Sequence, residues 1–159
     1  MINEIYNVYI TKVIFMKKII SVLIVLLLCG CSNKKVVIYI DDAPKAVGPY
    51  NQAIVYGDTI YCSGQIAIDP KTNEFVNGDI TIQTKQVFNN IKALLNAAGS
   101  DLSKVIKCNV YLTNIDDFSI MNDIYASYFE GCDYPARSAV EVSNLPKGAL
   151  IEVEVIAIK

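Results

Sequence analysis

The sequence of 159 residues contains no histidine. This absence excludes histidine-based catalytic triads, histidine zinc sites and histidine general bases. No Cys-x-x-Cys pair suggests a metal site, and no internal repeat or low-complexity segment is present. The formal net charge is −2, the sequence pI is near 5.1, and no stripe of Lys and Arg is interleaved with aromatic residues. We therefore expect neither a metal nor a nucleic-acid partner.

The N-terminal segment has the pattern of a bacterial secretory signal. Lys17 and Lys18 precede an apolar run over 19–28, which is shorter than the roughly 20 residues that span a bilayer. The following Leu28-Cys29-Gly30-Cys31 resembles the lipobox of bacterial lipoproteins, whose last cysteine is lipidated and becomes the new N-terminus. Cys31 is therefore the expected lipidation site, and Cys29 is a weaker candidate. An uncleaved membrane anchor or a buried apolar strand is the alternative interpretation.

The lipoprotein interpretation divides the chain into four parts. Residues 1–15 look like an over-extended start, because a signal normally begins with Met followed by lysines, as Met16-Lys17-Lys18 does. Residues 16–30 form the signal peptide, 31–35 the lipidated cysteine and a spacer, and 36–159 a single domain. The expected location is outside the cytoplasm, anchored to a membrane by the lipid. A cytoplasmic location is the alternative.

Three cysteines remain in the domain, which is an odd number and does not suggest a disulfide framework. Cys62 and Cys108 fall in strand-like runs, so we expect them to be buried and inert thiols. Cys132 follows the second predicted helix.

Hydrophobic periodicity predicts an α+β domain. Strand patterns occur at 36–40, 53–56, 59–66, 105–112, 134–142 and 145–155. A helix from Asp79 carries an apolar stripe that ends before Gly99, and a second helix covers about 117–129, with Phe118, Met121, Tyr125 and Tyr128 on its buried side. This order predicts a mixed β-sheet with two helices packed on one face.

The last two strands are predicted to form a hairpin around Pro146 and Gly148. If their valines and isoleucines enter one core, Arg137, Glu152 and Glu154 share the opposite face. A cation beside carboxylates on a rigid sheet can hold a small anion and position a water. The same face also carries Asn109 and Tyr111, so it is either solvated or packed symmetrically against copies of itself.

Several short motifs together carry a family resemblance. They are Ala43-Pro44-Lys45-Ala46-Val47-Gly48-Pro49-Tyr50-Asn51-Gln52-Ala53, Ser63-Gly64-Gln65-Ile66-Ala67-Ile68-Asp69-Pro70, Asn122-Asp123-Ile124-Tyr125, Pro135-Ala136-Arg137 and Ile151-Glu152-Val153-Glu154. Each is weak alone: Gly-Pro fixes an ordinary turn, and Gly64 marks either a close backbone approach or a bulge. In this order, over roughly residues 41–158, they resemble the RidA family of YjgF-type enamine/imine deaminases.

The resemblance implies a chorismate-mutase-like fold in a homotrimer, with sites in the clefts between subunits and no cofactor. It also implies hydrolysis of 2-iminobutanoate and 2-iminopropanoate to 2-oxo acids and ammonia. By position, Arg137 matches the arginine that grips the substrate carboxylate, and Glu152 matches the carboxylate that orients water. The remaining matches are to the pocket wall (Tyr50, Ser63 and Gly64) and to a supporting polar residue (Asn122).

The chain departs from the family pattern at Ala139, where a cysteine is frequent, and at Asn51, where serine or valine is frequent. Since Arg137 and Glu152 are retained, we expect imine hydrolysis. Two alternatives stay open: a non-catalytic, membrane-tethered module that binds small carboxylates or a partner protein, and a purely structural salt bridge between Arg137 and Glu152.

Overall fold

The computed structural model describes residues 16–17 and 34–159. Residues 34–159 form one compact unit. Its elements follow the predicted order, with two short strands that were not predicted between the third strand and the first predicted helix. The strands are β1 (Lys35–Ile38), β2 (Ala53–Tyr56), β3 (Thr59–Gln65), β4 (Ile68–Asp69), β5 (Glu74–Phe75), β6 (Val105–Leu112), β7 (Ala136–Glu141) and β8 (Ile151–Ile158). The helices are α2 (Ile80–Ala97) and α3 (Phe118–Tyr128), with short 3₁₀ turns at Leu102–Lys104, Ile115–Asp117 and Pro146–Gly148.

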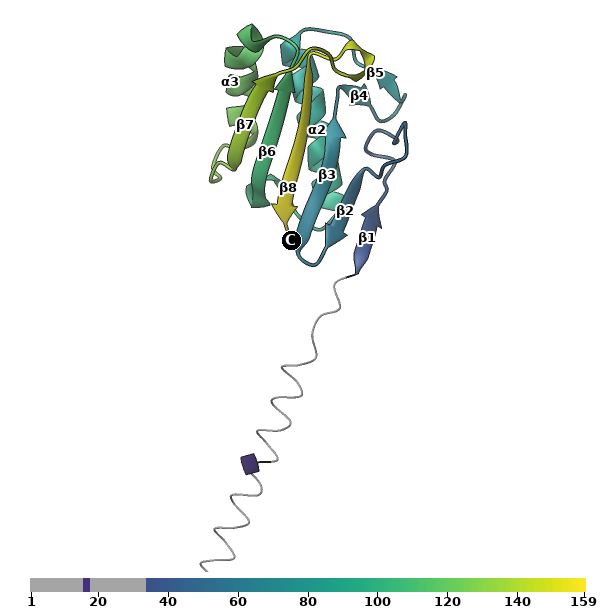
Figure 1. Ribbon diagram of the computed structural model, residues 1–159, viewed down its shortest axis with the longest axis vertical. Coiled ribbons are helices and arrows are strands. Elements are labelled where there is room, and N and C mark those ends of the chain that lie inside the picture. The colour runs from purple at the N-terminus through teal and green to yellow at the C-terminus, as the bar shows by residue number, and fades with distance from the viewer. Residues whose placement is uncertain (1–15, 18–33) are drawn as a thin grey trace, which may run out of the picture. The chain divides into compact units, whose positions relative to one another are not determined.

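Six of the strands form one mixed sheet in the order β1-β2-β3-β8-β6-β7. All neighbours are antiparallel except β6 and β7, which are parallel. Both helices cover the same face of this sheet, as Figure 1 shows. The α+β prediction with two helices on one face of a mixed sheet is therefore confirmed.

Local sequence signals account for the start and the end of α2 and for the end of α3. The Asp79 side chain caps α2 by accepting a hydrogen bond from the backbone N–H of Ile82 at 2.9 Å. Just beyond α2, Gly99 has φ +81°, a conformation that costs glycine little. Gly131 plays the same role after α3, with φ +79°. The predicted boundaries are correct to within one or two residues.

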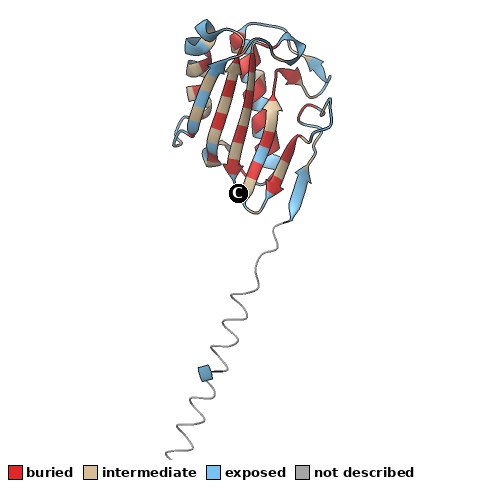
Figure 2. Ribbon diagram, viewed as in Figure 1, coloured by how far each residue is buried: buried red, intermediate tan, exposed pale blue. Residues whose placement is uncertain are grey.

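The core lies between the helices and one face of the sheet. In β8, Ile151, Val153, Val155 and Ala157 are buried, and the residues between them are half-buried. Figure 2 shows this alternation along the central strands. Cys62 and Cys108 are buried in this core, as predicted, and Cys132 is half-buried.

The predicted terminal hairpin is wrong. β7 pairs only with β6, whereas β8 lies between β3 and β6, so β7 and β8 border opposite edges of the same strand. The connection after β7 passes the end of β6 instead of closing a tight turn. Within it, the 3₁₀ turn Pro146–Gly148 contains Lys147 at φ 59°.

The predicted position of Arg137 is also wrong. Arg137 is the register partner of Cys108, which faces the helices, whereas Glu152 is the partner of Tyr111 on the open face. Val140 is 46% exposed, while Ala139 packs against the core. The apolar face of β7 is therefore shifted by one residue from the predicted one. Phe118, predicted to be buried, is 37% exposed.

Most of the predicted signal segment, including Cys29, Cys31 and the apolar run over 19–28, lies outside the described residues. In the part of the chain that the structure describes, no helix is both long and apolar enough to cross a membrane.

Candidate functional site

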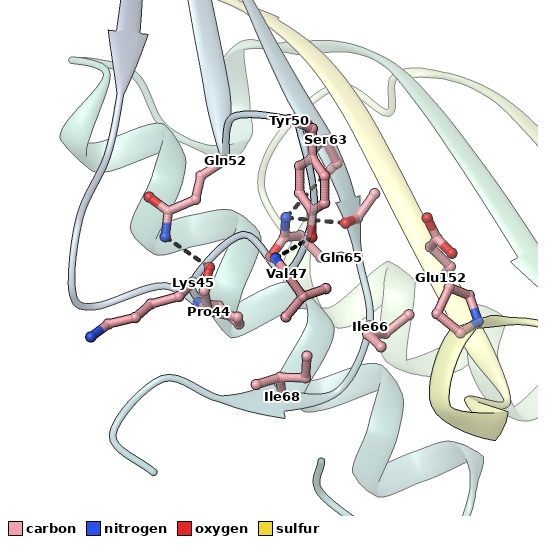
Figure 3. Close-up of a pocket in the computed structure, with 12 residues that line it drawn as sticks. Pro44, Lys45, Val47, Tyr50, Gln52, Ser63, Gln65, Ile66, Ile68 and Glu152 are labelled. Atoms are coloured by element: carbon pink, nitrogen blue, oxygen red, sulfur yellow. Dashed lines mark hydrogen bonds between the residues drawn. The ribbon is translucent and has the colours of Figure 1, made fainter. Parts of the chain in front are cut away.

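A cavity of about 310 Å³ opens at the C-terminal end of β3, next to the start of β8. Its walls come from the 44–50 loop, the end of β3, β4, the 3₁₀ turn at Pro146 and the start of β8 (Figure 3). The residues lining it are Pro44, Lys45, Val47, Tyr50, Gln52, Ser63, Gly64, Gln65, Ile66, Ile68, Pro146 and Glu152. Four of the predicted site residues, Tyr50, Ser63, Gly64 and Glu152, therefore lie around one cavity.

Gln52, which stands in the first motif but was assigned no role there, holds the loop that forms one wall. Its buried side chain accepts a hydrogen bond from Ile40 N at 2.7 Å, and its Nε2 lies 2.8–3.0 Å from the carbonyl oxygens of Ile40, Ala43 and Pro44. A single amide thus satisfies the backbone that leads into the loop, where no regular structure does so. The one feature of the sequence that could have indicated this role is the position of Gln52, one residue before β2.

Tyr50 is oriented by its own loop. Its backbone N–H donates to Gly48 O at 2.8 Å, and its hydroxyl oxygen accepts from Val47 N at 3.4 Å. The ring is 46% exposed, so one side of it stays open to a ligand or to another chain.

Ser63 and Gly64 lie where the β3–β8 pairing shifts register, between Cys62 and Gln65. The Ser63 hydroxyl donates to Asn51 O at 2.6 Å. A Cβ built on Gly64 would stand 1.8 Å from Glu152 Oε1, so only glycine leaves room for this carboxylate. Gly64 therefore marks both a bulge and a close approach, although the approaching group is a side chain of the same chain.

Glu152 is the carboxylate in this cavity that is free to act. Burial, and secondarily the nearby charge of Glu154, raises its pKa above the ordinary value. Within the described residues it accepts no hydrogen bond, whereas Glu154 Oε1 accepts from Asn109 Nδ2 at 2.8 Å and from the Tyr111 hydroxyl at 3.0 Å. A partly desolvated, unpaired carboxylate with a raised pKa is suited to accept a proton from water.

A second cavity, of about 440 Å³, lies on the opposite face of the sheet, between β7 and α3. It is lined by Asn122, Tyr125, Ala126, Tyr134, Pro135 and Arg137. Arg137 Nη2 donates to Asn122 Oδ1 at 2.8 Å, whereas Nη1 is buried without a hydrogen-bond partner. Because Arg137 is the only arginine in the sequence, this is the only guanidinium that can clamp a carboxylate.

The sequence-predicted site residues thus form two groups rather than one. Tyr50, Ser63, Gly64 and Glu152 lie at the first cavity, and Asn122 and Arg137 lie at the second. Arg137 and Glu152 face opposite sides of the sheet, so the alternative of a salt bridge between them within one chain is wrong. Among the described residues, no three His, Cys, Asp or Glu side chains gather closely enough to hold a metal ion.

Comparisons with known proteins place this fold and these motifs in one family. Residues 40–159 match the family model described as endoribonuclease L-PSP. A RutC family protein of Pyrococcus horikoshii is 58% identical over 125 residues, which cover 79% of this chain and 98% of that protein. The chain therefore belongs to the endoribonuclease L-PSP family, which is the RidA family of the sequence resemblance.

Two further relatives bear on function and structure. The 2-iminobutanoate/2-iminopropanoate deaminase of Bos taurus is 45% identical over 117 residues, covering 74% of this chain and 85% of that enzyme. A crystal structure of the conserved Rid family protein YyfA from Yersinia pestis has a TM-score of 0.78 and 52% identity, and it covers 79% of this chain and 100% of that one.

Proposed function

We propose that this protein hydrolyses 2-imino acids, such as 2-iminobutanoate and 2-iminopropanoate, to 2-oxo acids and ammonia. Family membership and the 45% identity to a mammalian deaminase of these substrates support the general enamine/imine deaminase function. The observation that carries the proposal is the unpaired carboxylate of Glu152, half-buried in a cavity beside Gly64.

The site is completed between subunits of a homotrimer. The guanidinium of Arg137 and the carboxylate of Glu152 lie on opposite faces of one sheet, and each lacks a charged partner in the described chain. Packing one copy against the next places the Arg137 half of one subunit opposite the Glu152 half of its neighbour. Closed symmetry then repeats the same pairing at every interface.

The chemistry requires positioning and one proton acceptor. Arg137 binds the substrate carboxylate, which holds the imine carbon next to the water on Glu152. The imine reacts in its protonated form: Glu152 takes one proton from the water as the water oxygen bonds to this carbon and the C=N π pair moves to nitrogen, which gives a neutral carbinolamine. Glu152 passes this proton to the amine nitrogen. As the C–N bond breaks and ammonia leaves, the hydroxyl proton returns to Glu152 and the O–H pair forms the C=O bond of the 2-oxo acid.

Ammonia release tests this function. Imines are generated in situ from 2-aminobutanoate or alanine by an amino-acid oxidase, and the full-length protein is compared with Arg137→Ala and Glu152→Gln. We expect accelerated release by the native protein and a loss of about 10²- to 10⁴-fold in Glu152→Gln, which lacks the base. Equal rates for the native protein and Arg137→Ala would remove the catalytic assignment, and binding of 2-oxobutanoate without turnover would favour a carboxylate-binding module.

We also propose that Cys31 carries a lipid that anchors the domain to a membrane outside the cytoplasm. The support is the sequence pattern of two lysines, a short apolar run and Leu28-Cys29-Gly30-Cys31. A palmitate analogue should label the native protein in cells, and Cys31→Ser should abolish the label. An unlabelled native protein in the soluble fraction would support the cytoplasmic alternative.

A further inference from the structure

The guanidinium of Arg137 is held by two aromatic rings of α3. Its Cζ lies 4.3 Å from the ring centroid of Tyr125 and 5.5 Å from that of Phe118. Both distances are within the roughly 6 Å over which a cation is attracted to the face of an aromatic ring. Together with Asn122, these residues are spaced at i, i+4 and i+7, which places all three on one side of the helix.

These contacts leave the positive charge of Arg137 without a negatively charged partner. In residues 34–159 the guanidinium makes no salt bridge, and its one side-chain hydrogen bond, from Nη2, goes to the neutral amide of Asn122. Nη1 is buried and has no partner. A carboxylate partner would have to be displaced before a substrate carboxylate could bind, whereas aromatic rings and an amide orient the cation and leave Nη1 without a hydrogen-bond partner.

We propose that Phe118 and Tyr125 are positioning residues, whose rings fix the plane of the Arg137 guanidinium so that its unpartnered Nη1 can donate to the carboxylate of the ligand. The proposal rests on the deaminase function only for the identity of the substrate, since any small 2-oxo or 2-imino carboxylate presents the same anion. Without the rings, the long side chain must be ordered by the ligand itself, at a cost in affinity.

The rings are distinguishable from ordinary core aromatics. Tyr125 is buried and also contacts Phe88 and Phe129, but Phe118 is 37% exposed, so Phe118→Leu removes a ring face with little loss of core packing. Tyr128, on the same helix, stacks on Phe88 with centroids 5.0 Å apart and is not among the rings over Arg137. Tyr128→Leu is therefore the matched control.

The test uses the full-length protein and three readouts: the Kd of 2-oxobutanoate by calorimetry, kcat and KM for 2-iminobutanoate, and the guanidinium signal of ¹⁵N-arginine. The last readout is unambiguous because the chain has one arginine. We expect Phe118→Leu and Tyr125→Leu to weaken 2-oxobutanoate binding and to raise KM by about threefold to tenfold each. Phe118→Tyr and Tyr125→Phe, which keep the rings, should bind as the native protein does.

In the native protein, the ¹⁵N chemical shift of the guanidinium should differ from that of free arginine. In Phe118→Leu, it should move toward the free-arginine value. Tyr128→Leu should lower Tm without changing the Kd or this signal. Native binding of 2-oxobutanoate by Phe118→Leu, equal weakening in Tyr128→Leu, or a native protein that does not bind 2-oxobutanoate would overturn the proposal. A protein that binds 2-oxobutanoate but does not hydrolyse imines would contradict the deaminase function. It would not contradict the positioning role of Phe118 and Tyr125.

Discussion

The carboxylate of Glu152 occupies the space that a side chain on residue 64 would need. A Cβ on Gly64 would stand 1.8 Å from Glu152 Oε1 and 2.8 Å from its Cδ. The absence of a side chain at one residue of β3 thus determines where the carboxylate of β8 lies.

Gly64→Ala should lower kcat by at least about tenfold, because the new methyl group displaces the carboxylate that we propose orients the water. Imine hydrolysis by the purified variants measures it. The Glu152→Ala protein should be no less active when Gly64→Ala is added, since the displaced group is already gone. A Gly64→Ala enzyme with native kcat, or a double variant much weaker than Glu152→Ala, would contradict this coupling.

The raised pKa of Glu152 predicts opposite effects on activity and on stability. As pH falls through this pKa, the proposed base becomes protonated, so kcat/KM should fall at a pH above the ordinary carboxyl value of 4.5. Because burial penalises the charged form, the native fold is favoured at low pH, and this contribution is lost as pH rises through the folded-state pKa.

Glu152→Gln should therefore have a higher Tm than the native protein at pH 7 and nearly the same Tm near pH 4. Thermal unfolding at both pH values, with Glu130→Gln as an exposed control, checks the sign. A lower Tm of Glu152→Gln at pH 7 would mean that the folded protein favours the carboxylate, contrary to its burial.

Gln52→Leu should destabilise the fold and weaken substrate binding together. Leucine leaves the buried backbone groups of Ile40, Ala43 and Pro44 without their partner, which costs about 1–3 kcal/mol for each group that water does not reach. Chemical denaturation and KM measure the two effects. Gln86→Leu, which loses only the hydrogen bond to Asn90 within α2, should stay close to the native protein in both; a Gln52→Leu protein with native KM would show that the loop keeps its shape without the amide.

Thiol reagents should distinguish the three cysteines of the domain. Burial raises the pKa of both Cys62 and Cys108 to about 12, so neither forms a reactive thiolate near pH 8, whereas Cys132 is half-buried. Mass spectrometry of the native protein after brief iodoacetamide treatment should find modification at Cys132 and none at Cys62 or Cys108. Modification of Cys108 before unfolding would indicate that the core beside Arg137 opens readily.

Much of this fold was accessible from the sequence, because hydrophobic period and capping residues act locally. The Asp79 cap, the stripe of α2 and the Gly99 stop place the first helix to within two residues. Strand pairing is not local in this sense. Alternation fixes which residues share a face of a strand, but not which neighbour the strand takes, and β7 joined β6 instead of β8.

For the candidate site too, the sequence identified the residues but did not predict where each of them lies. The motifs named Tyr50, Ser63, Gly64, Asn122, Arg137 and Glu152, but the pattern of β7 placed Arg137 on the wrong face, since Val140 looks like a core residue and is exposed. The rings over Arg137 were missed because an aromatic stripe on a helix usually means core packing. The i, i+4, i+7 spacing of Phe118, Asn122 and Tyr125 could have indicated that the two rings and the amide share one side of the helix.

The most direct test of the proposed function mixes two inactive proteins. Arg137→Ala and Glu152→Ala subunits are unfolded, combined in equal amounts and refolded, and imine hydrolysis is measured beside each variant refolded alone. If each site pairs Arg137 of one subunit with Glu152 of the next, random assembly restores about one quarter of the sites, and activity should return to about that fraction of the native value. No recovery in the mixed assemblies would contradict a site shared between subunits.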